Sequence, residues 1–154
     1  MTNSMVNIRP LTRADEPEWR RLWTGYLEYY ESTVSEEVYR TTFERLVSDV
    51  DNEFSGLIAE IDGQSVGLTH YLFHRSCWSV ENVCYLQDLF VEPELRGKSI
   101  GRALIEAVYD AADKAGHPGV YWMTQHFNQV GRRLYDRVAQ QSPFIVYERE
   151  GHDV

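Results

Sequence analysis

The segment from residue 83 to residue 125 constrains the fold more than any other part of the sequence. Residues 83–91 form an almost wholly apolar run, which is typical of a buried strand. Residues 97–114 then carry apolar side chains at helical spacing, and another apolar stretch follows at 120–125. Strand, helix and strand in this order predict parallel neighbouring strands joined by a right-handed crossover, and hence a mixed α/β fold.

The rest of the chain predicts mostly antiparallel structure. Asp62-Gly63 stands between two alternating segments and is a strong hairpin signal. Asp15 with Glu18, and Thr33 with Glu36, have capping-box spacing and predict two helix starts. We expect a single domain over residues 1–154. Its predicted strands are 6–11, 54–61, 65–73, 83–91, 120–125 and 144–150. Its predicted helices start near Asp15 and directly after Thr33, and span 97–114 and 128–138.

Composition narrows the functional class. The formal net charge of −9 argues against a broad nucleic-acid-binding surface, and it fits either simple solubility or attraction of a cationic substrate. No apolar run approaches the roughly 20 residues of a membrane helix, so a cytoplasmic location is expected. The histidines and the two cysteines lack metal-ligand spacing, and we expect no metal.

The turn between the apolar strand and the following helix has the features of an anion site. Residues 96–102 read Arg-Gly-Lys-Ser-Ile-Gly-Arg, with three cationic side chains in an otherwise acidic chain. Glycines leave backbone N–H groups accessible, and the start of a helix attracts phosphate. A nucleotide-binding P-loop is excluded because Glu92 stands where that motif needs its first glycine. A solvated loop is the alternative interpretation.

Three separated motifs resemble the GNAT superfamily of N-acetyltransferases. They are the strand Tyr85-Leu86-Gln87-Asp88-Leu89-Phe90-Val91, the Arg-Gly-x-x-x-Gly turn from Arg96, and Asn128 followed by Leu134-Tyr135. Within the superfamily the chain is most similar to polyamine acetyltransferases and the small fungal histone-and-polyamine acetyltransferases. The resemblance implies a mostly antiparallel sheet flanked by helices, with a parallel, splayed strand pair at the cofactor site.

The same resemblance implies that acetyl-CoA is the co-substrate. It implies that backbone groups of the splayed strand bind the pantetheine arm, that the turn binds the pyrophosphate, and that Asn128 hydrogen-bonds the cofactor. Tyr135 is implied to protonate the departing thiolate. The cofactor-binding residues are therefore expected to be Leu89, Phe90, Val91, Arg96, Gly97, Lys98, Ser99, Ile100, Gly101, Arg102, Asn128 and Tyr135.

Ser99 departs from the family pattern, which usually has glycine at this position. A serine still offers its backbone N–H and a hydroxyl to a phosphate, but its Cβ crowds the approach.

The sequence leaves the general base open. An alkylammonium must lose a proton before it can be acetylated, which costs roughly 4–5 kcal/mol of free energy at pH 7. Related enzymes often carry glutamate where this chain has Gln87, and an amide is not a base. Asp88 is the nearest carboxylate, although a structural aspartate is the alternative. His126 is a second candidate, because imidazoles titrate near neutral pH.

The end of the first helix supplies candidate acceptor-binding residues. Tyr26, Leu27 and Tyr30 continue an apolar stripe and are expected in the core. Aromatic rings beside carboxylates suit a cationic amine. The candidates that lie off the stripe are Glu28, Tyr29 and Glu31.

The favoured function is acetyl transfer to a small cationic amine, a polyamine or an amino-acid-like acceptor. Protein lysine and N-terminal amines remain open as acceptors. A protein that binds acyl-CoA as a sensor without turnover is the alternative from another class, and an interaction protein without cofactor is a third. The β-prone end of the chain, residues 144–147, and the resembled branch both favour a homodimer.

Overall fold

The computed structural model describes residues 5–151. The chain divides into two compact units, Met1–Met123 and Thr124–Val154, and each is described by itself.

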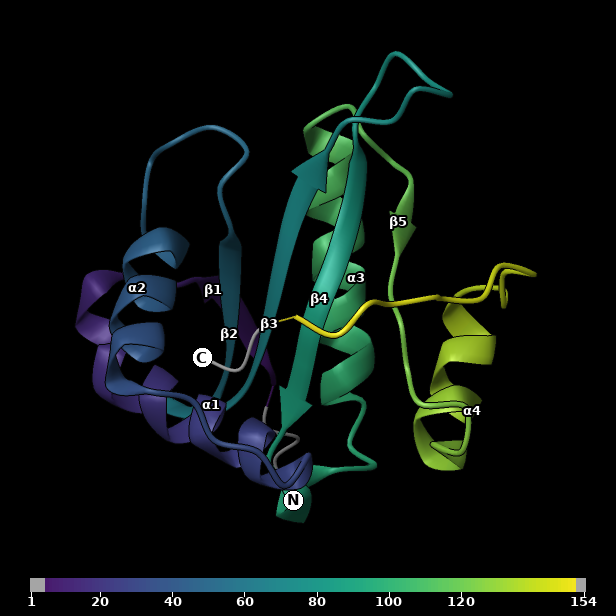
Figure 1. The fold of residues 1–154 in the computed structure, drawn as a ribbon. Helices are drawn as coiled ribbons and strands as arrows, with labels where there is room; N and C mark the ends of the chain where they lie inside the picture. The colour runs from purple at the N-terminus through teal and green to yellow at the C-terminus, as the bar shows by residue number, and fades with distance from the viewer. Residues whose placement is uncertain (1–4, 152–154) are drawn as a thin grey trace. The chain divides into compact units, whose positions relative to one another are not determined.

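The first unit is built on a mixed five-stranded sheet of order β1-β2-β3-β4-β5 (Figure 1). Strands β1 to β4 pair antiparallel with their neighbours, whereas β4 and β5 pair parallel. The predicted fold class is therefore confirmed. The strands are β1 (Asn7–Pro10), β2 (Ser55–Ile61), β3 (Gln64–His74), β4 (Val83–Val91) and β5 (Val120–Tyr121).

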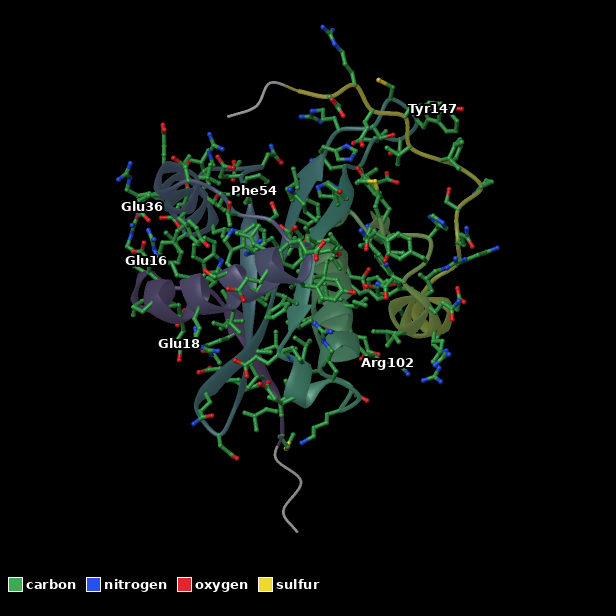
Figure 2. All side chains as sticks on the ribbon, turned by 60° about the horizontal axis from the view of Figure 1, so that its bottom comes forward. Glu16, Glu18, Glu36, Phe54, Arg102 and Tyr147 are labelled. Carbon is green, nitrogen blue, oxygen red and sulfur yellow. The ribbon has the colours of Figure 1, made fainter. Side chains whose placement is uncertain are left out.

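Helices cover both faces of this sheet. Helices α1 and α2 lie on one face, and α3 lies on the other (Figure 1). Arg20 of α1 forms ion pairs with Glu16 on its own helix and with Glu36 at the start of α2. Figure 2 labels the two glutamates. The helical segments of the unit are η1 (Arg13–Asp15), α1 (Glu16–Tyr29), α2 (Glu36–Leu46), η2 (Pro93–Leu95) and α3 (Ile100–Lys114).

The core has two layers, one on each side of the sheet. Facing α1 and α2, the rings of Trp19 and Phe43 pack at a centroid distance of 5.2 Å, with Phe90 of β4 in the same cluster. A Cβ at Gly25 would lie 2.9 Å from Cζ of Phe90, so glycine lets the ring reach α1. The apolar stripe of α3 forms the other layer, with these side chains buried: Ile100, Leu104, Ile105, Val108 and Ala112.

Turn and cap chemistry explain several element boundaries. Asp62 and Gly63 have φ values of 52° and 79°, as a two-residue hairpin between β2 and β3 requires, and this confirms the predicted turn. The helix start predicted from Thr33 and Glu36 is instead capped by Ser35, whose hydroxyl accepts from Val38 N at 3.3 Å.

Two predicted boundaries, the start of α3 and the end of β5, are wrong. Helix α3 begins at Ile100 rather than residue 97, because Gly97 and Ser99 have positive φ values of 84° and 64°. Strand β5 ends at Tyr121 rather than residue 125.

The predicted last strand, 144–150, has no regular secondary structure. Its side chains are exposed, as for Tyr147 (Figure 2). High β propensity does not make a strand without a neighbouring strand to complete the ladder.

The second unit contains one helix among its described residues, α4 (Gln129–Val138). Asn128 is its N-cap, with Oδ1 accepting from Gly131 N at 3.1 Å. The predicted helix over 128–138 is confirmed.

Candidate active site

Asp88 lies at an irregular point of the central strand β4. His70 of β3 is the partner of Asp88, whereas the next residue, Tyr71, is the partner of Leu86. Gln87 is therefore the extra residue of a β-bulge, and its side chain is exposed. The bulge changes which side of β4 each following residue faces, and such bulges are common beside active sites.

Asp88 is held by a buried histidine. Its Oδ2 lies 2.9 Å from Nδ1 of His70, and the two side chains are 12% and 4% exposed respectively. On the other side of the ring, the indole Nε1 of Trp19 donates to Nε2 of His70 at 3.0 Å. The three side chains form one hydrogen-bonded chain from the core to β4.

An aromatic wall from α1 surrounds this chain. The ring of Trp23 stacks on Tyr26 at 4.7 Å and lies 5.1 Å from His70, and Tyr30 packs on Tyr26 at 5.1 Å. Burial first, and then the negative charge of Asp88, raise the pKa of the Tyr26 hydroxyl well above its usual range. That hydroxyl is therefore protonated at neutral pH and is a neutral neighbour of the carboxylate.

One edge of β4 is open beyond the bulge. Its parallel ladder with β5 consists of two residue pairs, of which Tyr85 with Tyr121 is the second. At the far end of β4, Glu92 N donates to Val66 O at 2.9 Å. In an antiparallel ladder alternate residues direct both backbone groups to the same neighbour. Leu89 and Val91 therefore direct theirs away from β3, towards the open edge.

The three strand residues predicted to bind the cofactor thus differ in role. The ring of Phe90 is buried in the core against α1, and its backbone faces β3. Leu89 and Val91 have the backbone orientation that an extended ligand arm requires along this edge.

The turn after β4 leads directly into α3. Gly97 has a φ of 84°, and a Cβ placed on it would meet no atom within 4 Å. Ser99 is the N-cap of α3 in the left-handed conformation, and its side chain makes no capping hydrogen bond. Open space above Gly97, next to the N-terminus of a 15-residue helix, fits a phosphate group.

Arg96 brings the turn and the end of α1 together. Its Nε donates to Val91 O at 3.2 Å, and its guanidinium lies 5.2 Å from the ring centre of Tyr29 and 5.9 Å from that of Phe90. A residue predicted for the cofactor thus contacts one predicted for the acceptor. Tyr29 remains 49% exposed.

The other charged candidates lie on the surface. Arg102, at the start of α3 (Figure 2), pairs with Glu106 at 2.8 Å. Lys98, Glu28 and Glu31 are exposed. The prediction that Tyr30 lies in the core is wrong, because its side chain is 41% exposed, whereas Leu27 is buried as predicted.

The second unit carries the remaining candidates. Arg132 donates to the backbone O of His126 at 2.7 Å, and Asn128 Nδ2 donates to Thr124 Oγ1 at 3.1 Å. Tyr135 lies on α4, and its backbone O accepts a hydrogen bond from Ala139 N at 2.8 Å.

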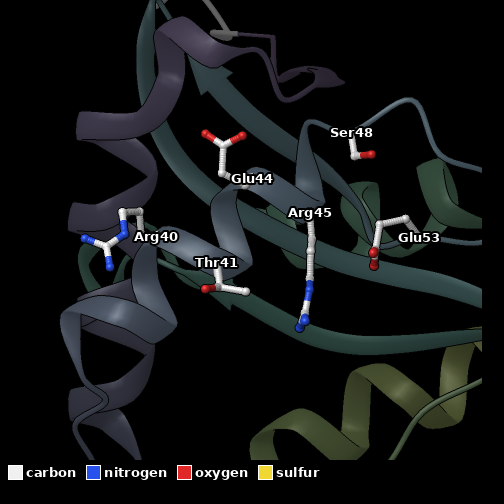
Figure 3. Close-up of a pocket in the computed structure, with 6 residues that line it drawn as sticks. All are labelled: Arg40, Thr41, Glu44, Arg45, Ser48 and Glu53. Carbon is white, nitrogen blue, oxygen red and sulfur yellow. The ribbon is translucent and has the colours of Figure 1, made fainter.

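A surface pocket of about 430 Å³ lies elsewhere in the first unit (Figure 3). Its lining comes from α2 and the segment after it, and includes Arg40, Arg45 and Glu53. None of its lining residues belongs to β4 or α3, so we assign it no catalytic role.

Within residues 5–151, no cluster of three or more His, Cys, Asp or Glu side chains is arranged to hold a metal ion. No helix of this described part is both long enough and apolar enough to cross a membrane.

Sequence reasoning identified Asp88 but missed its partners. The sequence alone suggests no role for His70, and it places Tyr26 in the core. The available signal was the polar His70 within the apolar run of β3, because a buried polar side chain needs a partner.

Comparison with known proteins agrees with this architecture. The sequence matches the acetyltransferase (GNAT) family over residues 19–139. It is 36% identical over 153 residues to the D-amino-acid N-acetyltransferase HPA3 of Saccharomyces cerevisiae, covering 99% of this chain and 95% of that protein. It is 28% identical over 98 residues to the thialysine N-epsilon-acetyltransferase of Caenorhabditis elegans, covering 63% and 61% of the two chains.

A solved structure shares the fold. The aminoglycoside N-acetyltransferase AAC(6')-Iy, in complex with a bisubstrate analogue of CoA and acetylneamine, superposes with a TM-score of 0.82 at 19% identity. The match covers 97% of this chain and 100% of that one. The extent of the family match and the identity to a full-length relative show that this chain is an N-acetyltransferase and belongs to the acetyltransferase (GNAT) family.

Proposed function

We propose that this protein transfers the acetyl group of acetyl-CoA to the amine of a small amino-acid-like acceptor, with Asp88 as general base. The observation that carries the proposal is the position of Asp88. It is held by His70 at the bulge of β4, one residue before the open edge formed by Leu89 and Val91. The activity named for the yeast relative supports an amino acid as the acceptor, and that named for the nematode relative supports a side-chain amine.

The residues present fit acetyl-CoA. Leu89 and Val91 offer backbone groups to a pantetheine arm, and the open space above Gly97 beside the start of α3 suits a pyrophosphate. Lys98, Arg96 and Arg102 add positive charge to this turn. We assign Asn128 a hydrogen bond to the cofactor on the basis of the family resemblance.

Acetyl-CoA supplies a thioester whose carbonyl carbon the acceptor amine attacks. Asp88 accepts the proton that the acceptor ammonium must lose, directly or through a water molecule. Tyr135 donates its hydroxyl proton to the leaving sulfur and regains one from solvent. His126 is the alternative base, and Gln87, which has no basic group, is assigned a polar contact only.

The acceptor wall is assigned to the end of α1. Tyr29 supplies an aromatic face that already packs on a guanidinium, and Glu28 and Glu31 supply negative charge at the surface. We further propose that residues 1–154 act as one catalytic domain, as a homodimer in the cytoplasm. The free thiols of Cys77 and Cys84 fit a reducing compartment.

The test is an acceptor panel with acetyl-CoA, read by release of the CoA thiol and by mass spectrometry of the product. The panel contains D- and L-amino acids, thialysine, spermidine and a lysine-containing peptide. We expect the highest kcat/KM with an amino acid or thialysine, and loss of kcat but not of cofactor binding in Tyr135→Phe. If acetyl-CoA raises the melting temperature of the protein but its acetyl group is transferred to no amine, the sensor function is favoured instead. Faster transfer to the peptide would favour a protein acetyltransferase.

A further inference from the structure

The hydrogen-bonded chain Trp19–His70–Asp88 fixes the proton of the histidine. An indole nitrogen only donates, so Nε2 of His70, 3.0 Å from it, must accept and carries no proton. The ring proton therefore resides on Nδ1, where it is donated to Asp88 Oδ2 at 2.9 Å. This assignment follows from the chemistry of Trp19 alone.

The same contact opposes a second proton on the ring. An Nε2–H would face the indole N–H of Trp19, so two donors would meet without an acceptor. His70 is 3% exposed and Trp19 is 0% exposed, so water cannot readily relieve that conflict. Trp19 thus keeps His70 as a neutral imidazole.

We propose that His70 and Trp19 are positioning residues that hold the Asp88 carboxylate through a neutral donor and so keep it basic. The inference rests on the proposed role of Asp88 in acetyl transfer. An imidazolium in the same place would neutralise the carboxylate and weaken it as a proton acceptor. A neutral imidazole fixes Oδ2 and leaves the full negative charge for the acceptor proton.

The other groups around Asp88 preserve this arrangement. Tyr26 and Tyr30 face it from α1, and Tyr85 from its own strand. Burial is the first cause of a raised pKa for each of these hydroxyls, so all three are neutral at physiological pH. The positive charge of Arg96 also acts on Tyr30.

The first test needs neither acetyl-CoA nor activity. Nitrogen-15 NMR of histidine-labelled protein distinguishes the two tautomers and the imidazolium. We expect His70 to show the Nδ1–H tautomer at pH 7, because its Nε2 accepts from Trp19. In Trp19→Phe, which frees Nε2, we expect the Nε2–H tautomer of His70 to become populated as well. An Nε2–H tautomer or an imidazolium at pH 7 in the unmodified protein would overturn the inference.

The second test separates positioning from packing. His70→Phe keeps a ring but removes the donor, and we expect kcat to fall on the order of 10–100-fold, with the KM for acetyl-CoA unchanged, because small displacements of a reacting group are costly. His70→Asn restores a neutral donor near the Nδ1 position and should recover most of the rate. His74→Asn, on the same strand but bonded to Tyr121, is the matched control.

Comparison with Asp88→Asn distinguishes failure of the positioning role of His70 from failure of the proposed function. If Asp88→Asn abolishes transfer while His70→Phe keeps the full rate, the positioning role is overturned and the proposed function stands. If Asp88→Asn keeps the full rate, the assigned base and its positioning both fail. If the double variant is no slower than Asp88→Asn alone, His70 acts through Asp88, as proposed. A further loss in the double variant would contradict that.

Discussion

Ser99 adopts a backbone conformation that glycine reaches at less cost. Its φ of 64° and ψ of 17° lie in the left-handed region, where a Cβ costs roughly 1–2 kcal/mol. Its side chain makes no capping bond that would compensate. The residue by which this chain departs from its family is therefore also a strained one.

We predict that Ser99→Gly raises the free energy of unfolding by about 0.5–1 kcal/mol, because it relieves this strain while adding some entropy to the unfolded chain. Urea denaturation measures the change. The matched variant is Gly97→Ala, at a φ of 84°, which should lower stability by about 1 kcal/mol. A less stable Ser99→Gly protein would mean that the hydroxyl makes a contact worth more than the strain.

Among the elements of the fold, the segment from β4 through the turn to α3 supplies most of the residues that the proposed chemistry uses. Gly101 lies in the first turn of α3, where a carboxylate does not harm the helix but repels phosphate. We predict that Gly101→Glu folds normally yet loses most of its affinity for acetyl-CoA.

Calorimetry and thermal shift measure this effect. The unmodified protein should gain about 2.7 kcal/mol of stability at a cofactor concentration 100 times its Kd, and the variant should gain far less. Gly101→Gln has nearly the same bulk without the charge and is the control. Equal binding by all three proteins would exclude this turn as the pyrophosphate site.

Most elements were predictable from the sequence because their signals are local. The hairpin at Asp62-Gly63 follows from its turn residues, and helix α3, apart from its start, follows from its apolar periodicity. The strand expected at 144–150 was wrong because pairing depends on a neighbour that propensity does not reveal. The partners of Asp88 were missed for a similar reason. His70 is 18 residues away in sequence and Trp19 is 51 residues from His70, and only the sheet brings them together.

At the scale of the whole molecule, acid should weaken the fold through Asp15. Hydrogen bonds from Arg9, then from Thr12, lower the pKa of this buried carboxyl to about 2, from an ordinary value of 3.8. A carboxyl group whose pKa is lower in the folded state stabilises the fold at pH values above its unfolded-state pKa. This stabilisation is lost as the pH falls through the folded-state pKa. We predict a loss of about 1–2 kcal/mol between pH 4 and pH 2.

The difference between the unmodified protein and Asp15→Asn isolates this effect, since the other carboxyl groups titrate in both. The stability gap measured in urea should be largest above pH 4 and should shrink towards pH 2. A gap that stays constant with pH would contradict the role of the Arg9–Asp15 pair.

The exposed segment 144–147 bears on assembly. Phe144 and Tyr147 are 79% and 90% exposed in the single chain, which is unusual for side chains of this size. We predict a homodimer by light scattering, and a shift towards monomer in Ile145→Lys, because a charge disfavours an apolar interface. A monomer at all concentrations would contradict the proposal.

The proposed role of Asp88 is tested most directly by measuring acetyl transfer and acetyl-CoA affinity together, in the unmodified protein and in Asp88→Asn. The substitution removes the carboxylate while keeping its shape, and general-base catalysis typically contributes 10²–10⁴-fold. We predict that both proteins bind acetyl-CoA equally well and that kcat falls at least about 100-fold in the variant. Equal kcat in the two proteins, or no binding of acetyl-CoA by either, would contradict it.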